Sequence, residues 1–201
     1  MKQKSLKLNV LMNMVLTMSS FIFPLITFPY VSRVLLPDGT GKVSFATSFI
    51  SYFSMFAQLG IPTYGIRACA KVRDNREELT RTAQELLTIN LVTTFLSYIA
   101  LTVFLTTVPR FQNDKSLYII ASLSIILTTF GMEWLYKALE QYVYITVRSV
   151  AFKLIALILM FVMIHEKSDY VIYGGISIFA ASASNLLNLI NIRKYIDIKR
   201  V

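Results

Sequence analysis

The chain alternates long runs of apolar residues with short polar stretches. Six of these runs are about as long as the roughly 20 residues that an α-helix needs to cross the hydrocarbon core of a membrane. They cover residues 8–31, 43–63, 86–108, 116–136, 146–165 and 170–192. A helix satisfies its own backbone hydrogen bonds inside hydrocarbon. The pattern therefore predicts an all-α, polytopic membrane protein with six transmembrane helices.

Proline and glycine mark the expected ends and weak points of these helices. Pro24 and Pro29 lie in the outer half of the first helix and predict a kink or break there, which makes them candidate hinges. Residues 29–42 contain two prolines and two glycines, so they predict a turn-rich, bent exit from the first helix towards the second. Pro109 is expected to end the third helix.

The positive charges fall on alternate sides of the predicted helices and indicate an orientation. Fifteen of the 20 Lys and Arg residues lie at the N-terminus and in the stretches 67–81, 137–153 and 193–200. The other side holds Arg33, Lys42, Arg110, Lys115 and Lys167. Because Lys and Arg favour loops that stay in the cytoplasm, both termini are expected there.

Composition agrees with a membrane protein and weighs against other classes. Of the 201 residues, 55% are hydrophobic and only 15% are charged, whereas soluble domains have about 25% charged residues. The net charge of +9 is attributed to cytoplasmic loops, since no basic face with interleaved aromatic residues predicts nucleic-acid binding. The uncharged run 8–32 is longer than the apolar part of a secretory signal, about 7–15 residues, and is interpreted as a retained helix.

Two cations near the start of the fifth predicted helix are the main candidates for a binding site. Twelve residues separate Lys153 from Glu166 at the outer end of that helix, which places Lys153 inside the hydrocarbon or close to its inner edge. Arg148 lies five residues nearer the cytoplasm. Either Lys153 extends its ammonium to the inner interface, or both cations line a water-filled cavity that receives an anionic group such as a phosphate.

Three further charged residues have both a structural and a functional interpretation. Glu133 and Lys137 are four residues apart and Glu140 follows one turn later, a spacing typical of ion pairs at an interface. The alternative is that Glu133 and Glu140 take part in ion coupling or gating. Arg33 belongs either to a structural loop, in which Asp38 pairs with Arg33 or with Lys42, or to the site for an anionic substrate.

Motifs for catalysis and metal binding are missing from the sequence. It contains no Gly-rich phosphate loop, no GxSxG and no Asp-x-Asp pair. His165 is the only histidine and Cys69 the only cysteine, so neither has a partner at metal-ligand spacing. We expect neither an enzyme nor a metal site, and no cofactor; the alternative that stays open is a coupling ion, H⁺ or Na⁺.

Several segments, taken together, resemble a known family of membrane carriers. They read FPYVSRVLLPDGTGKVSFATSFISYF, AQLGIPTYGIRACAKVRDN, GMEWLYKALEQYVYITVRSVAFK and SDYVIYGGISI followed by NLLNLINIRKY. In order and spacing they are similar to the N-terminal half of Wzx-type polysaccharide flippases, within the multidrug/oligosaccharidyl-lipid/polysaccharide exporter superfamily. The residues that match family motifs are Arg33, Gly39, Gly41, Gly60, Gly65, Arg67, Glu133, Trp134, Glu140 and Arg148. One departure is Leu36, which precedes Pro37 where the family usually has glycine.

The resemblance implies transport of undecaprenyl-diphosphate-linked oligosaccharide units across the bacterial cytoplasmic membrane, for O-antigen, capsule or another surface polysaccharide. Members pack two six-helix lobes around a cationic cavity. Residues 1–201 are then expected to form one transmembrane domain, the N-terminal lobe of a MATE-like transporter with its second lobe absent. The implied docking cations are Arg148, Lys153 and Arg33. Implied partners are the lipid-linked oligosaccharide, membrane lipids, a second lobe or a homodimer, and the polysaccharide polymerase machinery.

Two other interpretations stay open. A multidrug or small-molecule exporter of the same superfamily would need acidic residues deep in its cavity, and the predicted helices offer only Glu133, near an interface. A non-transporting membrane subunit, or a truncated fragment, would account for a chain about half as long as the family's members.

Overall fold

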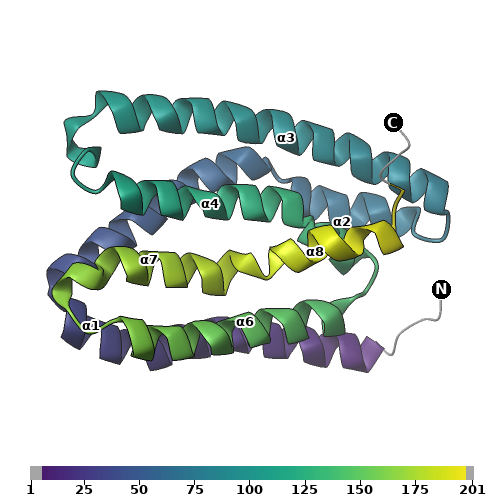
Figure 1. The fold of residues 1–201 in the computed structure, drawn as a ribbon. Coiled ribbons are helices and arrows are strands. Elements are labelled where there is room, and N and C mark those ends of the chain that lie inside the picture. The colour runs from purple at the N-terminus through teal and green to yellow at the C-terminus, as the bar shows by residue number, and fades with distance from the viewer. Residues whose placement is uncertain (1–5, 198–201) are drawn as a thin grey trace.

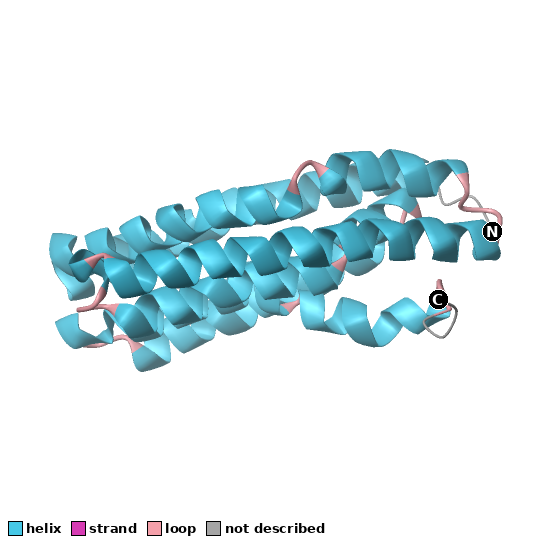
Figure 2. Cartoon of the chain, turned by 90° about the horizontal axis from the view of Figure 1, so that it is seen from above, coloured by secondary structure: helices cyan, strands magenta, loops and turns pink. Residues whose placement is uncertain are grey.

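The computed structural model describes residues 6–197, and every regular element within them is a helix. The long helices run roughly along a common axis and form an elongated bundle (Figures 1 and 2). The first turn of the chain's first helix and the last described helical turn lie at the same end of this bundle (Figure 1). The prediction of an all-α protein is confirmed.

The helices follow in the order α1 (Leu6–Gln58), α2 (Ile61–Lys71), α3 (Arg76–Thr107), α4 (Lys115–Gly131), α5 (Glu133–Ala138), α6 (Tyr142–Met163), α7 (Tyr170–Ile178) and α8 (Asn185–Asn191). Short 3-10 turns lie at Pro109–Phe111, Lys167–Asp169 and Ile192–Lys194. A π-helix, Phe179–Ala183, joins α7 to α8.

The first two predicted helices are two arms of one bent helix, α1, which diverge from Leu36 (Figure 1). Residues 32–42 are helical apart from Leu36, whose backbone angles are φ 58° and ψ 176°. The predicted turns are therefore wrong, whereas the predicted bend is present at Leu36. Helical angles continue through Pro24 and Pro29, so the break predicted there lies at Leu36 instead. A hinge role for the two prolines stays a prediction.

Leu36 adopts a backbone conformation that is essentially restricted to glycine. We expect L36G to stabilise the chain by about 1 kcal/mol, because relief of strain worth about 1–3 kcal/mol exceeds the extra backbone entropy that glycine loses on folding. Leu36 is 37% exposed, so the loss of its apolar contacts offsets part of this gain, equally in L36G and L36A. Thermal unfolding in detergent measures the effect. The control is L36A, which removes the same atoms but keeps Cβ; equal stabilisation by both variants would show that backbone strain is not the cause.

Four segments within residues 6–197 are long and apolar enough to cross a membrane. They are Leu6–Lys71, Arg76–Thr107, Tyr142–Met163 and Lys167–Lys194. The first of them contains both arms of α1, and α4 is apolar but has only 17 residues. The number of six crossings and the cytoplasmic location of the termini therefore stay predictions, as does the division into a single domain.

Two helix boundaries differ from the predicted ones for local reasons. α3 begins at Arg76 rather than near residue 86 because the Asn75 side chain accepts hydrogen bonds from the backbone N–H groups of Glu77 and Glu78. The predicted helix 116–136 is divided at Met132, whose φ of 42° ends α4 and starts α5 in a new direction. The end of α3 just before Pro109 is as predicted.

Basic residues from the two predicted sides lie at opposite ends of the long helix α3. Arg76 begins this helix and pairs with Asp197 at 2.9 Å. Beyond the other end, the Arg110 guanidinium lies 5.0 Å from the centre of the Phe45 ring. At that same end Lys42 approaches Asp114 at 3.9 Å. These three residues lie as the predicted sidedness requires, and the orientation in the membrane stays a prediction.

Candidate functional site

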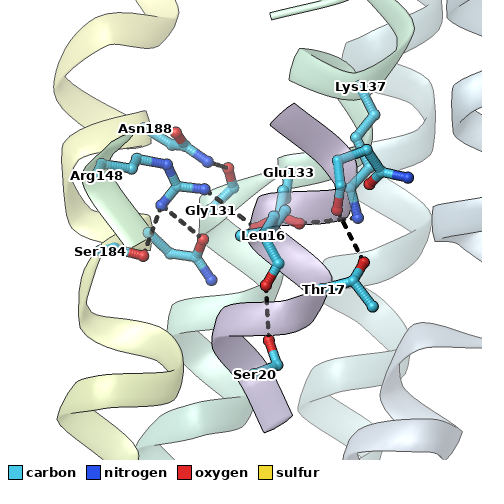
Figure 3. Close-up of polar contacts among 11 residues, drawn as sticks. Leu16, Thr17, Ser20, Gly131, Glu133, Lys137, Arg148, Ser184 and Asn188 are labelled. Carbon is cyan, nitrogen blue, oxygen red and sulfur yellow. Dashed lines mark hydrogen bonds and ion pairs between the residues drawn. The ribbon is translucent and has the colours of Figure 1, made fainter. Parts of the chain in front are cut away.

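Arg148 lies in a buried polar network between α5, α6 and α8 (Figure 3). Its guanidinium donates to Glu133 Oε2 at 3.1 Å, to Ser184 Oγ at 2.9 Å and to Asn185 Oδ1 at 3.1 Å. The side chain is only 2% exposed. Lys137 reaches the other oxygen of Glu133 at 2.9 Å. One carboxylate is therefore shared by two cations, and the ion pair predicted from the spacing of Glu133 and Lys137 is present.

Two segments of irregular backbone hold the partners of Arg148 in place. The π-helix Phe179–Ala183 ends immediately before Ser184, and π-helices often occur at functional sites. On the opposite side, Met132 has a left-handed conformation and starts α5 directly before Glu133. These two departures from regular helix bring a hydroxyl and a carboxylate to the same guanidinium.

Close contact between α4 and the α8 region also supports the network. A Cβ atom on Gly131 would lie 2.5 Å from Cβ of Asn185, so only glycine permits this approach. Asn188 Nδ2 donates to the Gly131 carbonyl at 2.6 Å, and the Tyr136 hydroxyl donates to the Asn188 carbonyl at 2.7 Å. Ser184, Asn185 and Asn188 were not predicted as site residues. Three polar residues this close together in an apolar run were the signal for them.

Lys153 occupies a different environment. Its ammonium donates to the hydroxyl oxygens of Ser19 and Ser20, both at 2.8 Å. These hydroxyls donate in turn to the Leu16 carbonyl at 2.7 and 3.1 Å, so their lone pairs are free to face the ammonium. Across residues 6–197, no carboxylate forms an ion pair with Lys153.

A cavity of about 400 Å³ opens beside Lys153, between the two arms of α1 and against α7 and the π-helix. We call it the hydroxyl-lined cavity, because its polar lining besides Lys153 consists of Ser20, Thr27, Ser44, Thr47, Tyr173 and Ser177. Hydroxyl groups both donate and accept hydrogen bonds, and an ammonium favours an anion. The arrangement is suited to a ligand that carries hydroxyl groups and a negative charge.

The predicted docking cations do not come together in this conformation. Lys153 borders the hydroxyl-lined cavity, whereas the Arg148 guanidinium is held by Glu133 and Ser184. Arg33 is exposed in the α1 segment that packs on Ile164, at the far end of α6 from Arg148. Substrate contacts by Arg148 and Arg33 stay predictions.

Glu140 pairs with Arg73, which lies in the connection between α2 and α3. The hydrogen bond and the charge of Glu140 raise the pKa of Arg73. This contact ties the end of α5 to the α2–α3 connection, which favours the structural interpretation of Glu140. Its role in gating is untested.

The described residues offer no cluster for a metal ion. Within residues 6–197, no group of three His, Cys, Asp or Glu side chains is close enough to hold one. The Lys153 ammonium has only donors and cannot coordinate a cation, so a role for it as an anion site stays a prediction.

The sequence matches a protein family described as "Polysaccharide biosynthesis protein" over residues 6–201. A curated protein of Escherichia coli (strain K12) named "Putative O-antigen transporter" is 28% identical over 183 residues. The alignment covers 91% of this chain and 43% of that relative, so the chain spans less than half of the relative's length. No solved structure matches.

These comparisons confirm the resemblance that the sequence segments carry. Together with several helices apolar enough to cross a bilayer, they indicate a multi-pass protein of the bacterial inner membrane. The chain belongs to the polysaccharide biosynthesis protein family.

Proposed function

We propose that this chain is the N-terminal lobe of a carrier that moves undecaprenyl-diphosphate-linked oligosaccharides across the inner membrane for surface polysaccharide synthesis. In this proposal the lobe crosses the membrane six times, with both termini in the cytoplasm. Family membership and the name of the Escherichia coli relative support a role in polysaccharide transport. The single observation that carries the proposal is the ammonium of Lys153 beside the hydroxyl-lined cavity.

The chemistry of that cavity fits the polar part of such a substrate. An ammonium has three N–H donors, and two of those of Lys153 already reach Ser19 and Ser20. The third is available for a phosphate oxygen. A positive charge that forms no ion pair with a carboxylate within residues 6–197 attracts an anion strongly where water is scarce. Sugar hydroxyl groups would exchange hydrogen bonds with the hydroxyl side chains of the lining.

Movement of the carrier is assigned to α1 in this proposal. Pro24 is part of the wall of the hydroxyl-lined cavity. Pro29 lies in α1 between Pro24 and the bend at Leu36. Bending at these prolines would change the distance between the two arms that enclose the cavity. Arg148 would join the diphosphate site in a conformation in which Glu133 releases it, and protonation or ion binding at Glu133 is the proposed coupling event.

Restoration of surface polysaccharide tests the proposal in Escherichia coli cells that lack their own O-antigen transporter. The chain is expressed alone, and also together with the part of the relative that the alignment does not cover. Polymer only in the second case is expected if the chain is one lobe, and polymer from the chain alone would indicate a pair of copies. The relative's part by itself is the control. Absence of polymer in both cases, at normal membrane insertion, contradicts transport by this chain.

A further inference from the structure

We infer that an apolar groove between the first arm of α1 and α6 holds the hydrocarbon chain of a polyprenyl lipid whose anionic head group lies at Lys153. This inference rests on the proposed function and assigns a separate place to the lipid part of the substrate. The groove has a volume of about 340 Å³. Its walls include Val15, Met18, Ile22 and Ile26 of α1 and Val150 and Leu157 of α6.

The groove and the hydroxyl-lined cavity meet at Lys153. Lys153 and Phe23 line both of them. Ser19 lines the groove and Ser20 lines the cavity, and the same ammonium donates to both serine oxygens at 2.8 Å. One cation therefore marks the border between an apolar space and a hydroxyl-rich space.

The groove, the Lys153 ammonium and the hydroxyl-lined cavity follow one another in the same order as the apolar, charged and hydroxyl-bearing parts of a lipid-linked sugar. Such a molecule has a hydrocarbon chain, then an anionic phosphate group, then hydroxyl-rich sugars. The chain would lie in the groove, the phosphate oxygens at the Lys153 ammonium, and the sugars in the hydroxyl-lined cavity. A phospholipid also offers a hydrocarbon chain and a phosphate, but its small head group would leave the cavity of about 400 Å³ largely unused.

The groove is open on its outer side. Met18 is 60% exposed, Ile22 47% and Leu154 56%, and all three line the groove. Apolar side chains exposed on a membrane-spanning bundle face hydrocarbon rather than water. The isoprene units nearest the head group would therefore lie in the groove, while the rest of a long chain continues into the bilayer.

Photolabelling tests this arrangement on the intact chain in phospholipid vesicles. The probe is a polyprenyl diphosphate with a diazirine on the isoprene unit next to the head group, and mass spectrometry locates the label. We expect label in α1 between Val15 and Ile26 and in α6 between Val150 and Leu157. Phosphatidylglycerol with a diazirine at the matching depth, and the uncharged polyprenol, are the comparison probes.

Two variants test whether the probe binds in the groove or elsewhere on the surface of α1. I22W fills the groove and should lower labelling by the diphosphate probe about tenfold, as expected for loss of a well-packed apolar contact. L25W places the same bulky ring three residues further along α1, at a side chain that is 72% exposed and does not line the groove. It should leave labelling unchanged.

The variant K153Q distinguishes binding of the hydrocarbon chain in the groove from binding of the anionic head group at Lys153. It should lower labelling by the diphosphate about tenfold and leave labelling by the polyprenol unchanged, because only the charged probe loses a charge-assisted hydrogen bond. If labelling depends on Lys153 but maps outside the groove, the groove does not hold the hydrocarbon chain, whereas Lys153 still binds the anionic head group. Equal labelling of the groove by phosphatidylglycerol would also overturn it. If no labelling depends on Lys153, both the groove and the proposed substrate site are wrong.

Discussion

Replacement of Lys153 by glutamine should reduce polysaccharide export at least about tenfold while the protein stays in the membrane in normal amount. Lys153 supplies the positive charge in the hydroxyl-lined cavity, and a hydrogen bond to a charged group contributes about 1.5–3 kcal/mol, which is roughly a 10–150-fold effect. Glutamine keeps a donor for Ser19 and Ser20 but carries no charge. An uncharged side chain is also less costly in hydrocarbon, so insertion should not suffer. The readout is surface polymer per cell in the system that restores it.

Two matched variants test whether a loss of export comes from the missing charge at Lys153. K153R keeps the positive charge and should retain most export. K167Q removes a lysine from the short turn between α6 and α7 and should have little effect, since Lys167 does not line the hydroxyl-lined cavity. Normal export by K153Q at equal protein level would remove Lys153 from the substrate site.

The helices were predictable because hydrocarbon leaves the backbone few alternatives, and a bend after the first helix was predicted too, but the helical conformation on both sides of that bend was not. Pro37, Gly39 and Gly41 are turn residues in water, and they indicated a loop over 32–42. In the structure Pro37 follows the bend as the first residue of the second arm, where its missing N–H has no cost. Gly39 is buried between the bend and α7: a Cβ there would lie 3.0 Å from the Leu35 Cβ and 3.5 Å from the Tyr170 Cβ. Helix packing, which the local pattern does not contain, decides the conformation here.

The candidate cations were predictable, but their partners were not. A charge in an apolar helix is visible in the sequence, and both Arg148 and Lys153 were identified that way. The serines that hold Lys153 lie more than 130 positions earlier in the chain. The contact between Arg148 and Glu133 requires the left-handed turn at Met132, which no residue preference indicates. These partners meet only when segments far apart in the sequence pack together, so a pattern of neighbouring residues does not predict them.

Removal of the Glu133 charge should destabilise the chain by about 3 kcal/mol. E133Q keeps the shape of the side chain but leaves the Arg148 charge buried without its carboxylate, and breaking a buried ion pair in this way costs about 3–5 kcal/mol. The lower value is expected because Glu133 is 31% exposed and Arg148 keeps its bonds to Ser184 and Asn185. Thermal unfolding in nanodiscs gives the difference. E140Q is the control: its pair with Arg73 is about one third exposed on both sides and should contribute less than about 1 kcal/mol.

A double-mutant cycle shows whether the loss comes from an uncompensated charge. R148M removes the cation, so the further change E133Q should then cost little, and the two effects should fall short of additivity by about 1–3 kcal/mol. Additive losses would mean that Glu133 stabilises the chain through Lys137 or through packing instead. Coupling of this size would also mean that Glu133 cannot release Arg148 without a compensating charge. A diphosphate at Arg148 would supply the charge that the guanidinium loses, and a proton or Na⁺ on Glu133 would neutralise the carboxylate, so the same pair would link substrate binding to the position of α5.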